Sequence, residues 1–307
     1  MAIAAPTPAS SRAESAPAAP IVVAQNLTKI FKDFWLRDRA RAVDGIDFEV
    51  RRGEIFGLLG PNGSGKSTTI KMILGLLKKS RGRLSVFGKP ANDVAVKRRI
   101  GYLPEESYLY PFLNARETLD YYAKLFGLEQ KVRERRIDEL LEMVGLAGVQ
   151  HRQVREYSKG MQRRIGLAQA LINDPELLIL DEPTTGLDPV GTRQVKDLII
   201  HLGRRGKTII LSSHLLTDVE DCVDRMVILY GGKIRAQGTC ADLLESRERS
   251  VIETDTLDEA TIAEIRSVLE RRSVRMAGVS RPRQRLEDLF VSIVERARAD
   301  QVATSGA

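Results

Sequence analysis

A run of small residues ending in lysine and serine, Gly60–Ser67 (GPNGSGKS), has the composition of a phosphate-binding loop. Glycines allow successive backbone N–H groups to turn around a phosphate, and a helix that begins directly afterwards adds its positive end. The Lys66 side chain can then reach the β- and γ-phosphates, and the Ser67 hydroxyl is placed to bind Mg²⁺. The pattern predicts a nucleotide site made by Gly60, Pro61, Asn62, Gly63, Ser64, Gly65, Lys66, Ser67 and Thr68.

A second chemical feature is a pair of carboxylates, Asp181 and Glu182, directly after the apolar run Leu177–Leu180. A buried strand tolerates acids at its carboxyl end, which is the edge at which parallel sheets bind ligands. There Asp181 can hold Mg²⁺ through water, and Glu182 can polarise an attacking water molecule. Such a pair alone could simply begin a solvated loop. Its presence in the same chain as the phosphate loop favours the catalytic interpretation.

The elements around these residues alternate between apolar runs and segments of helical periodicity, as in a parallel sheet with crossover helices. We predict strands at Glu54–Leu59, Leu177–Leu180, Thr208–Ser212 and Met226–Tyr230, and a hairpin through Gly231-Gly232 to Lys233–Ala236. We predict helices at Lys66–Leu77, Ala115–Phe126 and Val132–Val144, the last two in a charged helical insert. Near the C-terminus we predict a strand at Ser250–Thr254 and helices at Asp258–Arg271 and Arg285–Ala297.

Three further motifs appear in order: YSKGM at Tyr157–Met161, GLD at Gly186–Asp188, and His214 just after the predicted strand Thr208–Ser212. With them the sequence resembles the ABC (ATP-binding cassette) ATPases over residues 21–245. The segment YSKGM around Ser158 and Gly160 resembles the signature sequence of that family. The segment GLD ending at Asp188 resembles its D-loop, and His214 resembles its switch histidine. The resemblance implies that the signature serine, the signature glycine and a helix N-terminus contact the γ-phosphate of a nucleotide held by a second copy. It further implies that the D-loop crosses the dimer interface and that the switch histidine touches the γ-phosphate.

Two positions depart from the commonest family pattern. The signature has Lys159 and Met161 where glycine and glutamine are usual, but it keeps its serine and second glycine, so we expect the phosphate contact to be retained. Glu105 stands where the family has a glutamine that senses Mg²⁺ and couples to the membrane partner. The resemblance therefore places Ser67, Asp181 and Glu105 around the metal. For the aromatic ring that stacks on adenine, the candidate is Phe31, with Phe34 and Trp35 as alternatives.

Together these features predict an α/β fold: a P-loop NTPase core of the ABC-ATPase type, with a mixed sheet flanked by helices. We expect a nucleotide-binding domain at residues 21–245, with an inserted α-helical subdomain at about 104–172. A small C-terminal α+β appendage is expected at 246–298, between a disordered tail at 1–20 and a flexible tail at 299–307.

The composition is that of an ordinary globular protein, with 43% hydrophobic and 29% charged residues in a chain of 307. No stretch approaches the roughly 18 consecutive apolar residues of a membrane-spanning helix. The first 20 residues are rich in alanine, proline and serine and lack the unbroken apolar core of a secretory signal. We therefore expect a cytoplasmic protein, and the family resemblance implies that it is peripheral on the inner face of the cell membrane.

The combination of GYLPEE, YSKGMQRRIGLAQAL and a C-terminal LEDLF resembles the ATPase subunits of ABC-2 type exporters. That resemblance implies a dimer of two copies around two ATP, with Mg²⁺, and a separate membrane permease contacted near Glu105–Pro111. A soluble ABC ATPase acting on nucleic acid or ribosomes is the alternative, because the net charge is +7 and arginines cluster near the C-terminus. The family resemblance argues against this alternative, because ABC proteins that act on ribosomes carry two cassettes in one chain, and those that act in DNA repair interrupt the cassette with long coiled coils. This sequence has neither feature.

Overall fold

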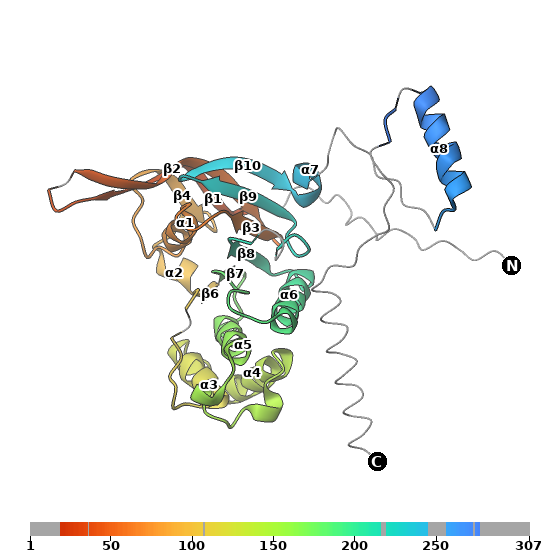
Figure 1. The fold of residues 1–307 in the computed structure, drawn as a ribbon. Helices are drawn as coiled ribbons and strands as arrows, with labels where there is room; N and C mark the ends of the chain where they lie inside the picture. Colours follow the sequence, from red (N-terminus) through yellow and green to blue (C-terminus); the bar gives the residue numbers. More distant parts are fainter. Residues whose placement is uncertain are drawn as a thin grey trace, which may run out of the picture. The chain divides into compact units, whose positions relative to one another are not determined.

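The computed structural model describes residues 19–244, apart from 36, 107 and 216–218, and residues 256–276, apart from 273 (Figure 1). The chain divides into two compact units, Met1–Leu243 and Leu244–Ala307. Within the described parts of the chain, every helix is too short or too polar to cross a membrane.

A mixed six-stranded sheet lies at the centre of the first unit, in the order β10-β9-β3-β8-β7-β6. Neighbouring strands from β6 to β9 in this order pair in parallel, and β10 pairs antiparallel with β9. The strands are β3 (Ile55–Leu59), β6 (Ile100–Leu103), β7 (Leu177–Leu180), β8 (Thr208–Ser213), β9 (Arg225–Tyr230) and β10 (Lys233–Thr239). The predictions of β3, β7, β8, β9 and the hairpin strand β10 are confirmed to within a few residues at each end.

Strand β7 explains why the central strands are apolar throughout. Leu178 and Leu180 pack in one hydrophobic core, whereas Leu177 and Ile179 pack in another on the opposite face. A strand covered on both faces needs a continuous apolar run rather than alternation. The register pairs Leu180 of β7 with Leu211 of β8, so the carboxyl ends of neighbouring strands meet at one edge of the sheet. The residues that follow β3, β7 and β8 are brought together there.

A second, four-stranded antiparallel sheet has the order β2-β1-β4-β5, and its strands were not predicted from the sequence. They are β1 (Pro20–Lys32), β2 (Asp38–Arg51), β4 (Arg81–Val86) and β5 (Lys89–Pro90). Figure 1 shows the long β1–β2 hairpin projecting from the rest of its unit. Near its tip Phe34 and Trp35 are 91% and 72% exposed, and their rings meet edge to face. Strand β1 begins at Pro20, the last residue of the segment predicted to be a disordered tail.

The helical insert consists of α3 (Ala115–Leu125), α4 (Gln130–Met143) and α5 (Lys159–Ala170). Buried residues of all three helices, among them Leu119, Leu140 and Ile165, share one core with β7 and β8. Helix α3 begins with a reciprocal capping box between Asn114 and Glu117. The predicted helices at Ala115–Phe126 and Val132–Val144 are confirmed. Further helices of this unit are α2 (Val94–Lys97), η1 (Ala147–Val149), η2 (Val154–Glu156), α6 (Pro189–Arg204) and α7 (Cys240–Leu244).

Helix α1 (Lys66–Ile73) is shorter than predicted, because the prediction extended it to Leu77. Gly75 adopts φ 66°, a left-handed conformation that ends a helix. The N–H of Leu76 then bonds back to the Lys71 carbonyl at 2.9 Å. The glycine at this position is the signal for the helix end.

Helix α5 approaches β6 with no side chain between their backbones. A Cβ atom added to Gly101 would lie 1.9 Å from the carbonyl oxygen of Ala170 and 2.9 Å from the ring of Pro175. Just beyond α5, the Asn173 amide donates to the Arg98 carbonyl at 2.9 Å. The C-terminal end of α5 is therefore held directly against the sheet.

In the second unit, helix α8 (Glu259–Arg271) confirms the helix predicted at Asp258–Arg271. Asp258 caps it by accepting a hydrogen bond from the Thr261 N–H at 2.8 Å. The predicted strand Ser250–Thr254, the predicted helix Arg285–Ala297 and the predicted tail at 299–307 lie outside the described residues.

Candidate active site

The loop between β3 and α1 has a backbone that only glycine can adopt at several positions. Gly60, Gly63 and Gly65 have φ of 146°, 78° and 109°. A Cβ atom at Gly60 would lie 2.2 Å from the Leu229 carbonyl oxygen, and one at Gly65 would lie 2.5 Å from that of Ala42. The loop is thus packed from outside by backbone of β9 and β2. This explains the glycine spacing of the motif.

Lys66 and Ser64 are the buried polar side chains of this loop. The Lys66 ammonium donates to the carbonyl of Gly60 at 2.7 Å and lies 3.2 Å from Glu182 Oε1. The Ser64 hydroxyl is buried and finds no hydrogen-bond partner among the described residues. Ser67 and Thr68 are half-buried in the first turn of α1, and Pro61, Asn62 and Gly63 are exposed. An orphaned hydroxyl beside a lysine and a helix start fits a ligand that brings oxygen acceptors, as a nucleotide phosphate does.

The two carboxylates after β7 are both buried, at 3% exposure for Asp181 and 4% for Glu182. Ser212 of β8 joins them, because its hydroxyl donates to Asp181 Oδ1 at 2.5 Å and accepts from the Glu182 N–H at 3.0 Å. No group of three or more histidine, cysteine or acidic side chains suited to a metal occurs in the described residues. The donor set fits Mg²⁺, which takes one or two carboxylates and completes its shell with water and phosphate oxygens.

Glu182 is held by three side chains from three different segments. His214 Nδ1 lies 2.8 Å from Glu182 Oε2, and since an ionised carboxylate only accepts, the proton of this bond is on the histidine. The Thr185 hydroxyl also donates to Oε2, at 3.2 Å, and Lys66 faces Oε1. Burial raises the pKa of Glu182. The His214 hydrogen bond and the Lys66 charge together have a larger effect in the opposite direction, so the pKa lies below its ordinary value. Glu182 is therefore ionised at neutral pH and able to accept a proton.

The backbone at Glu182 is strained, and an arginine of the helical insert holds it in that conformation. Its φ of 50° is rare outside glycine and asparagine, and such conformations cost about 1–3 kcal/mol. The Arg163 guanidinium of α5 donates to the Glu182 carbonyl at 2.7 Å and to the Asp181 carbonyl at 2.6 Å. Burial lowers the pKa of Arg163 to about 10, which leaves it charged at neutral pH. No role for Arg163 or for Ser212 was predicted from the sequence.

The remaining predicted site residues lie at helix starts or on the surface. Ser158 caps α5 by accepting from the Met161 N–H at 3.3 Å, and Asp188 caps α6 by accepting from the Gly191 N–H at 2.7 Å. Gly160 lies beside Leu187, since a Cβ atom added to the glycine would be 4.0 Å from the leucine side chain. The signature and D-loop segments are therefore neighbours within one chain.

Phe31 and Glu105 are the least enclosed of the predicted residues. Phe31 of β1 is 39% exposed, and the Lys29 ammonium lies 5.1 Å from its ring centroid. The side chain of Glu105 is exposed, and its backbone carbonyl accepts from Arg163 at 2.9 Å. Neither position is enclosed in the buried cluster of Lys66 and Glu182.

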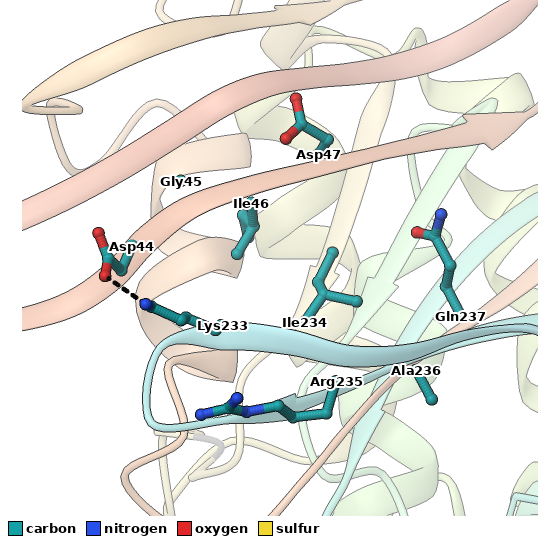
Figure 2. A pocket seen from close by; sticks show the side chains of 9 residues that line it. All are labelled: Asp44, Gly45, Ile46, Asp47, Lys233, Ile234, Arg235, Ala236 and Gln237. Atoms are coloured by element: carbon teal, nitrogen blue, oxygen red, sulfur yellow. Dashed lines mark ion pairs between the residues drawn. The ribbon is translucent and has the colours of Figure 1, made fainter.

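An open groove of about 590 Å³ lies between β2 and β10 (Figure 2). Its walls carry both polar and apolar side chains, and the ion pair of Asp44 with Lys233 spans 3.4 Å across one end. None of the predicted site residues lines this groove. The neighbouring β9–β10 turn has a positioning role, because the Asp44 N–H donates to the Gly232 carbonyl at 2.8 Å and the Gly232 N–H donates to the Ser64 carbonyl at 3.2 Å. The β9–β10 turn thus ties the phosphate loop to the antiparallel sheet.

Comparison with known proteins gives the family. The sequence matches the ABC transporter family over residues 43–185. An uncharacterized ABC transporter ATP-binding protein of Synechocystis sp. is 46% identical over 231 residues, which cover 74% of this chain and 65% of the relative. The bacitracin transport ATP-binding protein BcrA of Bacillus licheniformis is 40% identical over 242 residues, covering 78% of this chain and 76% of that protein. Nod factor export ATP-binding protein I of Cupriavidus pinatubonensis is 41% identical over 207 residues, covering 67% and 64%.

A solved structure agrees with this match. A dimeric ATP-binding cassette in a post-hydrolysis state, bound to ADP and Pi, has a TM-score of 0.65 and 26% identity, covering 71% of this chain and 98% of that one. The fold and site define a P-loop ATPase of the cassette class. The chain belongs to the ABC transporter family, as an ATP-binding subunit. The reaction of such a subunit is the hydrolysis of ATP with Mg²⁺, and the subunit dimerises and pairs with a membrane permease.

Proposed function

We propose that this chain is the ATP-hydrolysing subunit of an ABC-2 type exporter, a homodimer that drives a separate permease from the cytoplasmic face of the membrane. The observation that carries the proposal is the cluster at the sheet edge, where the buried Lys66, Asp181 and Glu182 meet the exposed His214, from three separate segments. Relatives named for bacitracin transport and Nod factor export support the exporter branch.

Each residue of the cluster has a defined role in the proposed reaction. Lys66 and the loop N–H groups bind the β- and γ-phosphates, and Glu182 accepts the proton of the attacking water. Mg²⁺ bound beside Asp181, Ser67 and Glu105 supplies charge neutralisation for the phosphate oxygens. His214 orients the Glu182 carboxylate and contacts the γ-phosphate.

A second copy of the chain completes the site in this proposal. Ser158, Gly160 and Asp188 sit at the starts of α5 and α6, and each chain has a single signature segment. We propose that these residues close over the nucleotide held by the opposite copy, with the helix N-terminus facing its γ-phosphate. Phe31 is proposed to stack on the adenine.

The permease is proposed to dock on exposed aromatic residues between β6 and α3. Tyr108, Tyr110 and Phe112 are 83%, 53% and 71% exposed, and Tyr110 meets Tyr121 of α3 edge to face. Exposed aromatic side chains are favoured anchors at protein interfaces. They follow directly on Glu105, whose carbonyl is bonded to Arg163, so a bound permease helix would lie one short segment from the catalytic strand end.

The test is co-expression of the chain with its permease, followed by purification of the complex and measurement of its ATPase rate. Tyr108→Arg and Tyr110→Arg should weaken the complex and abolish transport while leaving the ATPase rate of the isolated chain unchanged. Val132→Arg is the matched control, since Val132 is an exposed apolar residue of α4 in the same helical insert. Complexes that form normally with both tyrosine variants would contradict the docking surface. ATPase activity that is stimulated by DNA or RNA and needs no permease would favour the nucleic-acid alternative.

A further inference from the structure

Arg163 uses every hydrogen-bond donor of its guanidinium on backbone carbonyls. Nε donates to Pro183 at 3.0 Å, Nη1 to Pro104 at 2.5 Å and to Glu105 at 2.9 Å. Nη2 donates to Asp181 at 2.6 Å and to Glu182 at 2.7 Å. Arginine has five such donors, so none is left for solvent, and the residue is only 6% exposed.

These five bonds join three separate parts of the site. Arg163 itself stands in the second turn of α5, shortly after the signature residues Ser158 and Gly160. Pro104 and Glu105 directly follow β6, at the start of the proposed docking segment, residues 104–112. The remaining carbonyls belong to the residues directly after β7, which include both carboxylates. A single side chain therefore connects the signature helix, the docking segment and the catalytic strand end.

The bond to Glu182 has a particular geometric effect. The residue is fixed on its two sides, because its N–H donates to Ser212 of β8 and its carbonyl accepts from Arg163 of α5. Between these two bonds the backbone takes its left-handed conformation, which an unrestrained glutamate would leave. The direction of the Cα–Cβ bond, and hence of the carboxylate, depends on both anchors.

We infer that Arg163 is a positioning residue, which holds the Glu182 carboxylate in line for water activation and transmits movement of the docking segment to it. This inference rests on the proposed role of Glu182 as the base. All five donors of Arg163 are taken by carbonyls outside the phosphate loop, so its replacement should lower kcat and leave the KM for ATP nearly unchanged. Misplacement of a catalytic group by about 1 Å can reduce a rate roughly 100-fold.

The experiment measures steady-state ATP hydrolysis by the purified full chain for Arg163→Lys and Arg163→Met. Lysine supplies three donors and can retain part of the network, so we expect kcat to fall about 10-fold for lysine and roughly 100-fold for methionine. The matched control is Arg164→Lys, on the next residue of the same helix, which donates to the Val144 carbonyl within the helical insert. This control should stay within about 2-fold of the wild-type kcat, because the bond it alters is remote from the carboxylates. The methionine variant tests the full loss, and the lysine variant keeps the inference testable if methionine prevents folding.

A double-mutant cycle separates positioning from a general loss of stability. If Arg163 acts through Glu182, then Arg163→Lys should cause no further loss of single-turnover hydrolysis in a Glu182→Gln background. A further loss of the same size in that background, or a wild-type kcat for Arg163→Lys alone, would overturn the inference. A wild-type chain that does not hydrolyse ATP, or a fully active Glu182→Gln variant, would instead refute the proposed function.

Discussion

The substitution Glu182→Gln tests the catalytic centre most directly, because glutamine has the same shape and removes only the charge and the basicity. The backbone anchors at Ser212 and Arg163 do not involve the side chain, so the local conformation should persist. Loss of a general base typically reduces a rate by about 10² to 10⁴, which corresponds to about 3–5 kcal/mol of activation free energy. We therefore expect ATP hydrolysis to fall by at least about two orders of magnitude.

The same substitution should affect stability and nucleotide binding in opposite directions. The carboxylate faces Lys66 through one oxygen and His214 through the other, whereas an amide has a single oxygen for both. One buried donor then loses its acceptor, so the free energy of unfolding should fall by about 1–3 kcal/mol. ATP binding should be equal or tighter, because Lys66 no longer has a carboxylate that competes with the phosphate oxygens. With hydrolysis blocked, ATP and Mg²⁺ should trap a dimer.

Three measurements check this prediction: phosphate release at steady state, nucleotide affinity by titration and molar mass in solution with ATP and Mg²⁺. The control is Glu176→Gln, the same chemical change at the residue before β7, at the other end of the strand. Turnover of the Glu182→Gln variant within about tenfold of wild type, with the control also active, would show that another group activates the water.

The other predictions concern the phosphate loop, the α5–β6 contact and acid stability. Lys66→Ala should abolish ATP binding because the phosphates lose their main cation, and an unchanged affinity by titration would contradict the assigned cradle. Gly101→Ala should lower the free energy of unfolding by about 2 kcal/mol or more, since the new Cβ would meet the Ala170 carbonyl at 1.9 Å; a thermal melt equal to wild type would contradict this. The hydrogen bond from Arg99 is the main cause that lowers the pKa of Glu176 from 4.5 to about 2. The ionised Glu176 therefore stabilises the fold fully above pH 4.5, and this stabilisation is lost as the pH falls toward 2. Glu176→Gln should lower the free energy of unfolding by about 1 kcal/mol at pH 7, a value discounted for the exposure of the side chain, and should not change it near pH 2. Denaturant titrations at both pH values measure it, and a constant difference would refute the linkage.

Strands β3, β7, β8 and β9 were predictable because they are buried on both faces, as the run Leu177–Leu180 illustrates, whereas the edge strand β6 was not predicted. The antiparallel sheet was not, because β1 contains register shifts and a left-handed residue, Asn26 at φ 47°, which break the alternation that would mark a strand. The paired carboxylates were found from their place after an apolar strand. Lys66 and His214 were found too, but Ser212 and Arg163 were not, since they become meaningful only when β8 and α5 are folded against β7.

The direct contact of Gly101 with Ala170 also determines how helix α5 can tilt. With its C-terminal end seated on β6, the helix would tilt about that end, and Ser158 lies about 18 Å away from it at 1.5 Å per residue. A tilt of about 10° would then sweep the signature serine through about 3 Å and Arg163 through about 2 Å. A displacement of Arg163 by about 2 Å is more than hydrogen bonds of 2.5–3.0 Å tolerate. The residues that follow β7 must therefore either move with the helix or lose their hydrogen bonds to Arg163. A tilt of α5 would therefore act on Glu182 through Arg163.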